Sequence, residues 1–515
     1  SATSTFASGI QISSGCFSIA GTCLSAGSSA SSTLLANNNT FSGQNVFSGA
    51  TTSFSNAITV GAGQGTSTFA GGLSTTRLNV TSGTSTFANG IVLTAGCFRD
   101  TSATSTCIGK GQAATYVVAA SNSKNKQYAD YIADGTGDQN EIQAAINAAY
   151  SASRGTGGKI YLLEGDFSVN GTTTMATGTM LVGSGVGTVL KVANATNQTF
   201  DVINFAGSAA KSIADITITD LTIDGNEANQ SGGERTGVFG EYAASSTIKN
   251  LNIHDINGTA IVIDYPRQIV INNNKLTRTA TAVFTDAIQL WTDGSYDSYD
   301  NIIHGNTIAY GAYSGSGVNL FGVDRTVVSG NTITDDQLLM DSGIQVRSSS
   351  RSPYGNSITG NVISNVKNNG IFLYDASSGT YPILTTSITG NTITGTAGRG
   401  IHLSAAQKTT VTGNVIDDAA QEGIYVVVTS HDNIISSNTV WDANGGIVLD
   451  GSSNRNVISS NRITDTAGTS YAISISSGAT DNTLANNFYS GTGASAIADY
   501  ATSSTKYTQW DRLTL

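Results

Sequence analysis

The chain has 515 residues, of which 11% are charged, and a formal net charge of −11. This length favours two or more structural units. The acidic balance argues against a nucleic-acid partner, because binding to phosphates needs a basic face. No run of 18 apolar residues occurs, so we expect no membrane span. The 59 glycines with only three prolines favour short strands joined by tight turns over a disordered chain.

The chain begins with Ser1 rather than methionine, as a processed secreted protein does. We therefore expect an exported, β-rich protein with a mature N-terminus, located outside the cell or at its surface.

Residues 1–110 form a repetitive segment with only four charged side chains. The motif TSTFA occurs at 3–7, 66–70 and 84–88, and phenylalanines recur between the copies. The spacing predicts short β rungs that must stack on neighbours or on another chain to bury their rings. The composition also allows the alternative of a flexible Ser/Gly linker. The rings in question are Phe6, Phe41, Phe47, Phe54, Phe69 and Phe87.

All four cysteines lie in this segment, in two copies of a GCF…TC motif. The spacing is not CxxC and no histidine is close, which argues against zinc. In an exported protein we predict two local disulfides, Cys16–Cys23 and Cys97–Cys107, among the three connectivities that four cysteines allow. Four reduced thiols in a core are the alternative.

The next segment, 111–200, contains the pattern of one amphipathic helix over 138–152. Asp138 and Glu141 are expected to form a capping box at its start. Three stretches follow in order, DGTGDQNEIQAAINAA, GGKIYLLEGDF and LVGSGVGTVL. They resemble the opening of the pectate-lyase-like right-handed β-helix superfamily, and the resemblance implies a helix that plugs the first coil. The apolar face of the helix consists of Ile142, Ala145, Ile146 and Ala149.

Residues 201–490 carry two markers that keep the same phase. A small residue precedes Ile-x-Leu or a similar step from Ala260 to Ala472, and an asparagine precedes an apolar step from Asn306 to Asn461. Both recur every 23–30 residues, which predicts one coil per repeat with coils stacked at ~4.8 Å. We expect the asparagines to form a structural ladder in an inward turn. These repeats resemble those of periplasmic copper-site accessory proteins and alginate epimerases.

The predicted fold is therefore all-β: a right-handed parallel β-helix (solenoid) with an N-terminal capping α-helix, preceded by a β-rich Ser/Thr/Gly repeat arm. The predicted domains are the arm (1–110), the start of the β-helix (111–200), the coils (201–490) and a C-terminal cap or tail (491–515).

Two columns of side chains should point outward from consecutive coils. One contains Gln289, Asn319, Gln345, Phe372, His402 and Tyr425, and the other contains Asp264, Trp291, Phe321, Arg347, Tyr374 and Ser404. Sugar rings stack on aromatic faces while amides bond to their hydroxyls, so the columns are compatible with a glycan groove. An exposed apolar stripe of this size favours, more strongly, a surface covered by the arm, a loop or another subunit. The candidate contact residues are Gln289, Trp291, Asn319, Phe321, Arg347, Phe372 and Tyr374.

Catalysis has one candidate cluster, five polar residues within a span of 19. Two of its carboxylates could act as acid and base, or could serve Ca²⁺-assisted lyase chemistry beside Arg267 or Arg325. The paired-aspartate and Gly-His pattern of polygalacturonases and the Arg-x-Pro-x-x-Arg pattern of pectate lyases are both missing. The four histidines fall in different registers, so we expect no metal site and no cofactor, with Ca²⁺ as the one ion the pattern allows. The cluster comprises Asp286, Asp293, Asp297, Asp300 and His304.

The arm distinguishes among three functions, because a free-standing enzyme has no need of 110 nearly uncharged, ring-rich residues. It favours a structural or adhesive surface protein, a self-associating fibre or filament subunit, and its repeats resemble those of fibrous phage and bacterial surface proteins. The alternatives are a tailspike-like glycan-binding protein and a secreted polysaccharide lyase or glycoside hydrolase. The sequence favours a role without catalysis.

Overall fold

The computed structural model describes most of the chain from residue 115 onward. The chain divides into two compact units, Ser1–Ala95 and Gly96–Leu515. In the first unit, the structure describes the backbone of one antiparallel hairpin, β1 (Phe17–Ile19) with β2 (Thr22–Leu24). The described ranges are 115–277, 285–309, 315–335, 337–348, 350–464, 471–490 and 497–501, with short strands at 17–19, 22–24, 98–99, 107–108 and 505–507.

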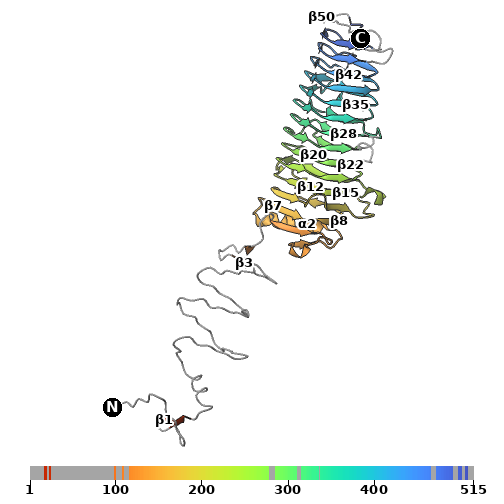
Figure 1. Cartoon of the computed structure of the whole chain (residues 1–515). Coiled ribbons are helices and arrows are strands. Elements are labelled where there is room, and N and C mark those ends of the chain that lie inside the picture. The colour runs from red at the N-terminus through yellow and green to blue at the C-terminus, as the bar shows by residue number, and fades with distance from the viewer. Residues whose placement is uncertain are drawn as a thin grey trace, which may run out of the picture. The chain divides into compact units, whose positions relative to one another are not determined.

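The second unit is a parallel β-helix whose strands form three parallel sheets, one strand of each sheet per coil (Figure 1). This confirms the predicted fold class. The first sheet has 16 strands. In spatial order they are β6 (Tyr131–Ile132), β5 (Tyr116–Ala119), β7 (Gly158–Leu162), β10 (Thr179–Val182), β14 (Thr217–Thr219), β18 (Thr247–Lys249), β21 (Val270–Asn272), β24 (Ile302–His304), β27 (Val327–Ser329), β30 (Ser357–Thr359), β34 (Ser387–Thr389), β38 (Thr410–Thr412), β41 (Ile434–Ser436), β44 (Val457–Ser459), β47 (Thr483–Ala485) and β50 (Thr505–Tyr507).

The second and third sheets have 13 strands each. The second contains β8 (Gly165–Val169), β11 (Thr188–Val192), β15 (Thr222–Asp224), β19 (Asn252–His254), β22 (Lys275–Thr277), β25 (Thr307–Ala309), β28 (Thr332–Thr334), β31 (Val362–Ser364), β35 (Thr392–Thr396), β39 (Val415–Ala419), β42 (Thr439–Trp441), β45 (Arg462–Thr464) and β48 (Phe488–Ser490). The third contains β9 (Thr173–Thr174), β12 (Phe200–Ala206), β16 (Arg235–Glu241), β20 (Ile261–Asp264), β23 (Ile288–Trp291), β26 (Ser316–Phe321), β29 (Ser342–Ser348), β32 (Asn369–Asp375), β36 (Arg399–Ser404), β40 (Glu422–Val427), β43 (Gly445–Leu449), β46 (Ile473–Ile475) and β49 (Ile497–Asp499).

Short elements lie between these strands. Two single-turn 3₁₀ helices, η1 (Lys126–Tyr128) and η2 (Glu227–Asn229), lie in connections. Two further pairs of parallel strands lie at turns between the sheets. These are β13 (Ile213–Ala214) with β17 (Ala243–Ala244), and β33 (Ile383–Leu384) with β37 (Ala406–Gln407).

The helix α2 (Gln139–Ala152) lies against the first coils (Figure 1). The four apolar residues of its predicted face are fully buried. The predicted capping box is wrong, because the side chain of Asp138 makes no capping hydrogen bond and its backbone is already helical (φ −61°). Its carboxylate instead accepts hydrogen bonds from the backbone N–H groups of Gly135 (2.8 Å) and Ser168 (2.7 Å). Asp138 therefore fixes the loop before the helix onto β8.

The core is a stack of aliphatic residues, one above another along each sheet. In the first sheet the stack includes Ile303, Val328, Ile358, Ile388 and Val411, all fully buried. Burying each such side chain contributes about 1.5–3 kcal/mol.

The glycine or alanine that precedes each Ile-x-Leu step is small because no larger side chain fits there. A Cβ atom on Gly370 would lie 2.4 Å from Cγ2 of Ile393 and 2.6 Å from the carbonyl oxygen of Gly400, both far inside contact distance. A larger side chain at this point of the coil would therefore displace the opposite sheet or the next coil.

The predicted asparagine ladder is confirmed. From Asn274 to Asn461, each buried asparagine donates Nδ2 to Oδ1 of the next one at 2.9 Å. The same Oδ1 accepts a hydrogen bond from the backbone N–H of the previous asparagine. A second ladder, Asn433–Asn456–Asn482, was not predicted and lies at the turn before the first sheet. The first ladder contains Asn274, Asn306, Asn331, Asn361, Asn391, Asn414, Asn438, Asn461 and Asn487.

Candidate functional site

The outer face of the third sheet carries the two predicted columns in the predicted register. Trp291 pairs with Phe321, Phe321 with Arg347, and Arg347 with Tyr374 across successive strands. We call these four residues the aromatic column; all four side chains are half-buried. Beside it, Gln289, Asn319, Gln345, Phe372, His402 and Tyr425 follow one another in the second column.

Ring contacts extend the aromatic column toward the N-terminal coils. The ring centroids of Trp291 and Phe321 are 6.2 Å apart, and Tyr265 lies edge-on to Trp291 at 5.4 Å. Tyr265 in turn stacks on Tyr242 at 4.3 Å, and Tyr296 packs edge-on against both tyrosines. Tyr242 and Tyr265 directly follow β16 and β20 in a left-handed backbone conformation, outside the repeating strand pattern, so the repeat did not indicate them.

Arg347 lies between two rings of the aromatic column. Its guanidinium carbon is 5.2 Å from the centroid of Phe321 and 5.8 Å from that of Tyr374. The Nε atom is buried and makes no hydrogen bond to the described residues. A buried polar atom without a partner is uncommon in folded proteins and indicates a place for a ligand or water.

Asp286 and Asn319 form a buried polar pair beside Arg347. Asp286 accepts hydrogen bonds from the backbone N–H of Ser316 (2.6 Å) and from Nδ2 of Asn319 (2.8 Å). Burial raises the pKa of Asp286 to about 6, although both hydrogen bonds and the charge of Arg347 act in the opposite direction. The other amide atom of Asn319, Oδ1, is buried and has no partner among the described residues.

His402 occupies the C-terminal part of the same face, between two rings. It stacks on Phe372 with centroids 4.5 Å apart and lies 5.2 Å from Tyr425. Burial, with a smaller effect of the nearby Arg399, lowers the pKa of His402 to about 3, so the imidazole is neutral at ordinary pH. Both ring nitrogens are buried without a hydrogen-bond partner among the described residues.

The five candidate catalytic residues lie on different elements. Asp286 precedes β23 of the third sheet, whereas His304 ends β24 of the first sheet and lies 3.0 Å from the hydroxyl of Ser329. Asp293 and Asp297 are exposed in the loop after β23, and Asp300 pairs with Arg325 at 2.7 Å. The guanidinium of Arg267 lies over the ring of Tyr296 at 3.8 Å. The close spacing in sequence therefore does not bring the five side chains to one sheet face.

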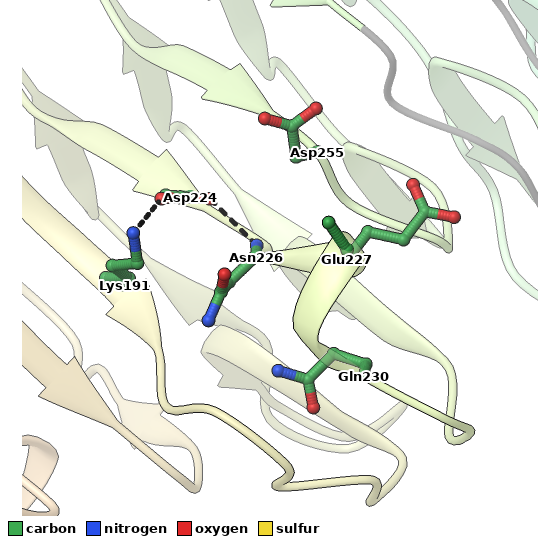
Figure 2. A pocket seen from close by; sticks show the side chains of 7 residues that line it. Lys191, Asp224, Asn226, Glu227, Gln230 and Asp255 are labelled. Carbon is green, nitrogen blue, oxygen red and sulfur yellow. Dashed lines mark hydrogen bonds and ion pairs between the residues drawn. The ribbon is translucent and has the colours of Figure 1, made fainter.

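A second polar group lies on the outer face of the second sheet. Lys191, Asp224 and His254 are cross-strand neighbours on β11, β15 and β19. Asp224, His254 and Asp255 bring one ligand atom each within 4.8 Å of one another. A pocket of about 610 Å³ adjoins them, lined by Lys191, Asp224, Asn226, Glu227, Ala228, Gln230 and Asp255 (Figure 2). The expectation of no metal site compared the histidines only with one another. Asp255 follows His254 directly in the sequence, but the sequence pattern did not indicate that Asp224, 30 residues earlier, is the cross-strand partner of His254.

The cysteine motifs fall in two antiparallel hairpins. Cys23 pairs with Ser18 in the hairpin of β1 and β2, and Cys107 pairs with Arg99 between β3 (Phe98–Arg99) and β4 (Cys107–Ile108). Cys16 and Cys97 lie outside the described residues, so both disulfides stay predictions.

Two family models match the chain. The model of the right-handed β-helix region matches residues 188–357, and that of the periplasmic copper-binding protein NosD matches residues 300–511. The mannuronan C5-epimerase AlgE5 of Azotobacter vinelandii is 33% identical over 144 residues, which is 25% of this chain and 14% of the epimerase. The chain thus spans only a small part of that relative.

Two solved structures have the same fold at low identity. The surface adhesin PfbA of Streptococcus pneumoniae is 17% identical, with a TM-score of 0.51 over 67% of this chain and 91% of the adhesin. A tailspike protein mutant of Escherichia coli bacteriophage HK620, solved with a hexasaccharide, is 11% identical, with a TM-score of 0.51 over 70% of this chain and 76% of the tailspike. Among the described residues, no helix is long and apolar enough to cross a membrane. With its three parallel sheets and the helix on its first coil, the chain has the right-handed parallel β-helix fold, and both family models match within residues 188–511.

Proposed function

We propose that this protein is an extracellular or cell-surface adhesive β-helix that binds a glycan along the outer face of the third sheet. The observation that carries the proposal is the aromatic column, in which rings on consecutive strands flank polar atoms that have no partner within the described part of the chain.

The chemistry of this face suits a sugar chain. Each half-buried ring offers an apolar surface on which a pyranose ring can stack, and strands in a sheet repeat at ~4.8 Å. Asn319 Oδ1 can accept a hydrogen bond from a hydroxyl, and Arg347 Nε can donate one. A partner that supplies both contacts would relieve the cost of leaving these buried atoms unpaired.

The known neighbours support the proposal through the fold they share with this chain. The tailspike was solved in complex with a hexasaccharide, and PfbA is named a surface adhesin. The epimerase activity belongs to a relative of which this chain covers 14%, so it supplies no evidence for catalysis here.

The repeat arm supports a finer proposal, that the β-helix is the rigid part of a fibre or filament subunit and residues 1–110 join the subunits. The support is the recurrence of phenylalanines on short segments with too few other apolar residues to enclose them.

Glycan arrays probed with the full chain test the glycan proposal, followed by titration calorimetry on the best ligand. We expect the double variant Trp291→Ala/Tyr374→Ala to fold normally and to bind the glycan about tenfold or more weakly, since stacking on one ring contributes on the order of 1 kcal/mol. Trp441→Ala is the matched control, because Trp441 is an exposed tryptophan on the second sheet. Equal binding by wild type and the double variant, in both glycan and self-assembly assays, would refute the proposed contact face.

A further inference from the structure

The polar group on the second sheet has the arrangement of a small coordination site. Asp224 and His254 end neighbouring strands, and their side chains point to the same side because they are cross-strand partners. His254 Nδ1 lies 3.9 Å from Asp224 Oδ1 and 2.9 Å from Asp255 Oδ2. The left-handed backbone of Asp255 (φ 52°) turns the chain at the end of β19 and brings its carboxylate back beside the imidazole.

The chain contains a second His-Asp dipeptide, His431-Asp432, whose surroundings differ from those of His254 and Asp255. His431 Nδ1 lies 2.8 Å from Asp432 Oδ2, and the guanidinium of Arg455 contacts both oxygens of Asp432 at 2.8 and 3.1 Å. That carboxylate is thus neutralised by an arginine. At the His254 pair, the carboxylate of Asp224 lies beside the imidazole, with its Oδ1 3.9 Å from His254 Nδ1.

Asp224 presents its two oxygens to different partners. Oδ2 pairs with the ammonium of Lys191 at 3.1 Å, and Oδ1 accepts the backbone N–H of Asn226 at 2.8 Å (Figure 2). Oδ1 also lies 3.9 Å from Nδ1 of His254. The Lys191 side chain is 45% exposed and can swing into solvent. The pocket of about 610 Å³ beside Asp224 and Asp255 leaves room for a further ligand or a water molecule.

The walls of this pocket are held by hydrogen bonds to the preceding coil. Asn226 Nδ2 donates to the carbonyl oxygen of Val192, and Gln230 Nε2 donates to that of Ala193, both at 2.8 Å. The turn that carries η2 is therefore fixed against β11, which preorganises the position of Asp224.

We propose that Asp224, His254 and Asp255 bind one divalent transition-metal ion, with Zn²⁺ the expected occupant. Zn²⁺ binds imidazole and carboxylate ligands at about 2.0–2.2 Å, which separates tetrahedral ligands by about 3.4 Å. The separations of 2.9 and 3.9 Å bracket this value. An imidazole ligand favours Zn²⁺ over Ca²⁺, which takes oxygen ligands. The fourth position would open to the pocket.

Calorimetric titration of Zn²⁺ into the untagged full chain, stripped with a chelator, tests this site. We expect one Zn²⁺ per chain, and binding weakened about tenfold or more in both His254→Gln and Asp224→Asn. His431→Gln is the matched control and should bind like wild type, because its pair has an arginine where the site has Asp224. Thermal unfolding with and without Zn²⁺ gives a second measurement, since an ion that binds only the folded chain raises the unfolding temperature.

Three results would overturn the proposal. The first is wild-type protein that takes up no Zn²⁺ and shows no thermal shift with it. The second is His254→Gln and Asp224→Asn proteins that are folded and bind Zn²⁺ as wild type does. The third is binding of Ca²⁺ in a parallel titration with Zn²⁺ excluded, which would contradict the choice of a transition metal.

Discussion

Asn361 donates its side-chain Nδ2 to Oδ1 of Asn391 at 2.9 Å, although 30 residues separate them in the chain. The same Asn361 accepts hydrogen bonds from the backbone N–H and the Nδ2 of Asn331, and donates to the carbonyl oxygen of Val328. One amide therefore satisfies buried polar groups of two neighbouring coils. The ladder therefore links successive coils from Asn274 to Asn487 through buried hydrogen bonds.

Replacing one ladder residue should therefore destabilise the fold. In Asn361→Ala the backbone N–H and the Nδ2 of Asn331 lose their acceptor and the carbonyl of Val328 loses its donor. We expect the free energy of unfolding to fall by about 2–4 kcal/mol, because buried polar groups without partners cost about 1–3 kcal/mol each. Denaturant unfolding measures the change. Thr332→Ala is the control. Thr332 is exposed and directly follows Asn331, so this substitution removes no buried hydrogen bond.

Asp264 should make the stability depend on pH. Burial, and then the charge of Glu241, raises the pKa of Asp264 to about 7, above its value of about 3.9 in the unfolded chain. Between these two values the folded state retains a proton that the unfolded state has lost, so the stabilising effect present below pH ~4 is lost as the pH rises to ~7.

Thermal unfolding of Asp264→Asn from pH 4 to 8 checks this dependence. The variant should match wild type near pH 4 and unfold a few degrees higher at pH 8, because asparagine stays neutral. In Glu241→Gln the stability should fall at a lower pH than in wild type, because the charge of Glu241 is one of the two causes that raise the pKa of Asp264. A constant difference between Asp264→Asn and wild type over this range would contradict the prediction.

The two GCF…TC motifs should hold the disulfides Cys16–Cys23 and Cys97–Cys107. The motif is duplicated and each loop is short, and a disulfide closing such a loop adds about 2–3 kcal/mol in the chain-entropy model. Mass spectrometry of an unreduced digest identifies the linked peptides. Four free thiols, or a link between the two motifs, would show that the pairing is wrong.

Deleting residues 1–110 should give a folded, monomeric β-helix that retains α2. The six phenylalanines of the arm can each contribute about 1.5–3 kcal/mol when buried on a neighbouring subunit. Assembly of the full chain should persist at high salt, because screening weakens only charged contacts and the arm has four charges.

Light scattering of the full and shortened chains at low and high salt measures both effects. If the shortened chain forms the same oligomer, the arm does not join the subunits. If it unfolds, the arm is part of the β-helix core, which would remove the main support for a filament subunit.

The coil repeat and its registers could be predicted because they depend on local rules. A residue such as Ile358 or Gly370 repeats its environment in every coil, so the same residue type is required at the same phase. The ladder asparagines are visible for the same reason. The second ladder escaped because its members recur over only three consecutive coils, 23 and 26 residues apart.

The repeat pattern predicts the parallel β-helix, the helix on its first coil, the asparagine ladder and the columns of side chains on the outer face of the third sheet. Which polar residues meet depends on how the coils stack and turn. Asp224 and His254 are 30 residues apart and become neighbours through cross-strand pairing, while Asp286 and His304 are close in sequence and lie on different sheets. The physical reason is that stacking fixes one residue per coil by its phase, whereas turns of variable length and left-handed residues such as Asp255 and Tyr265 set where the side chains between strands point.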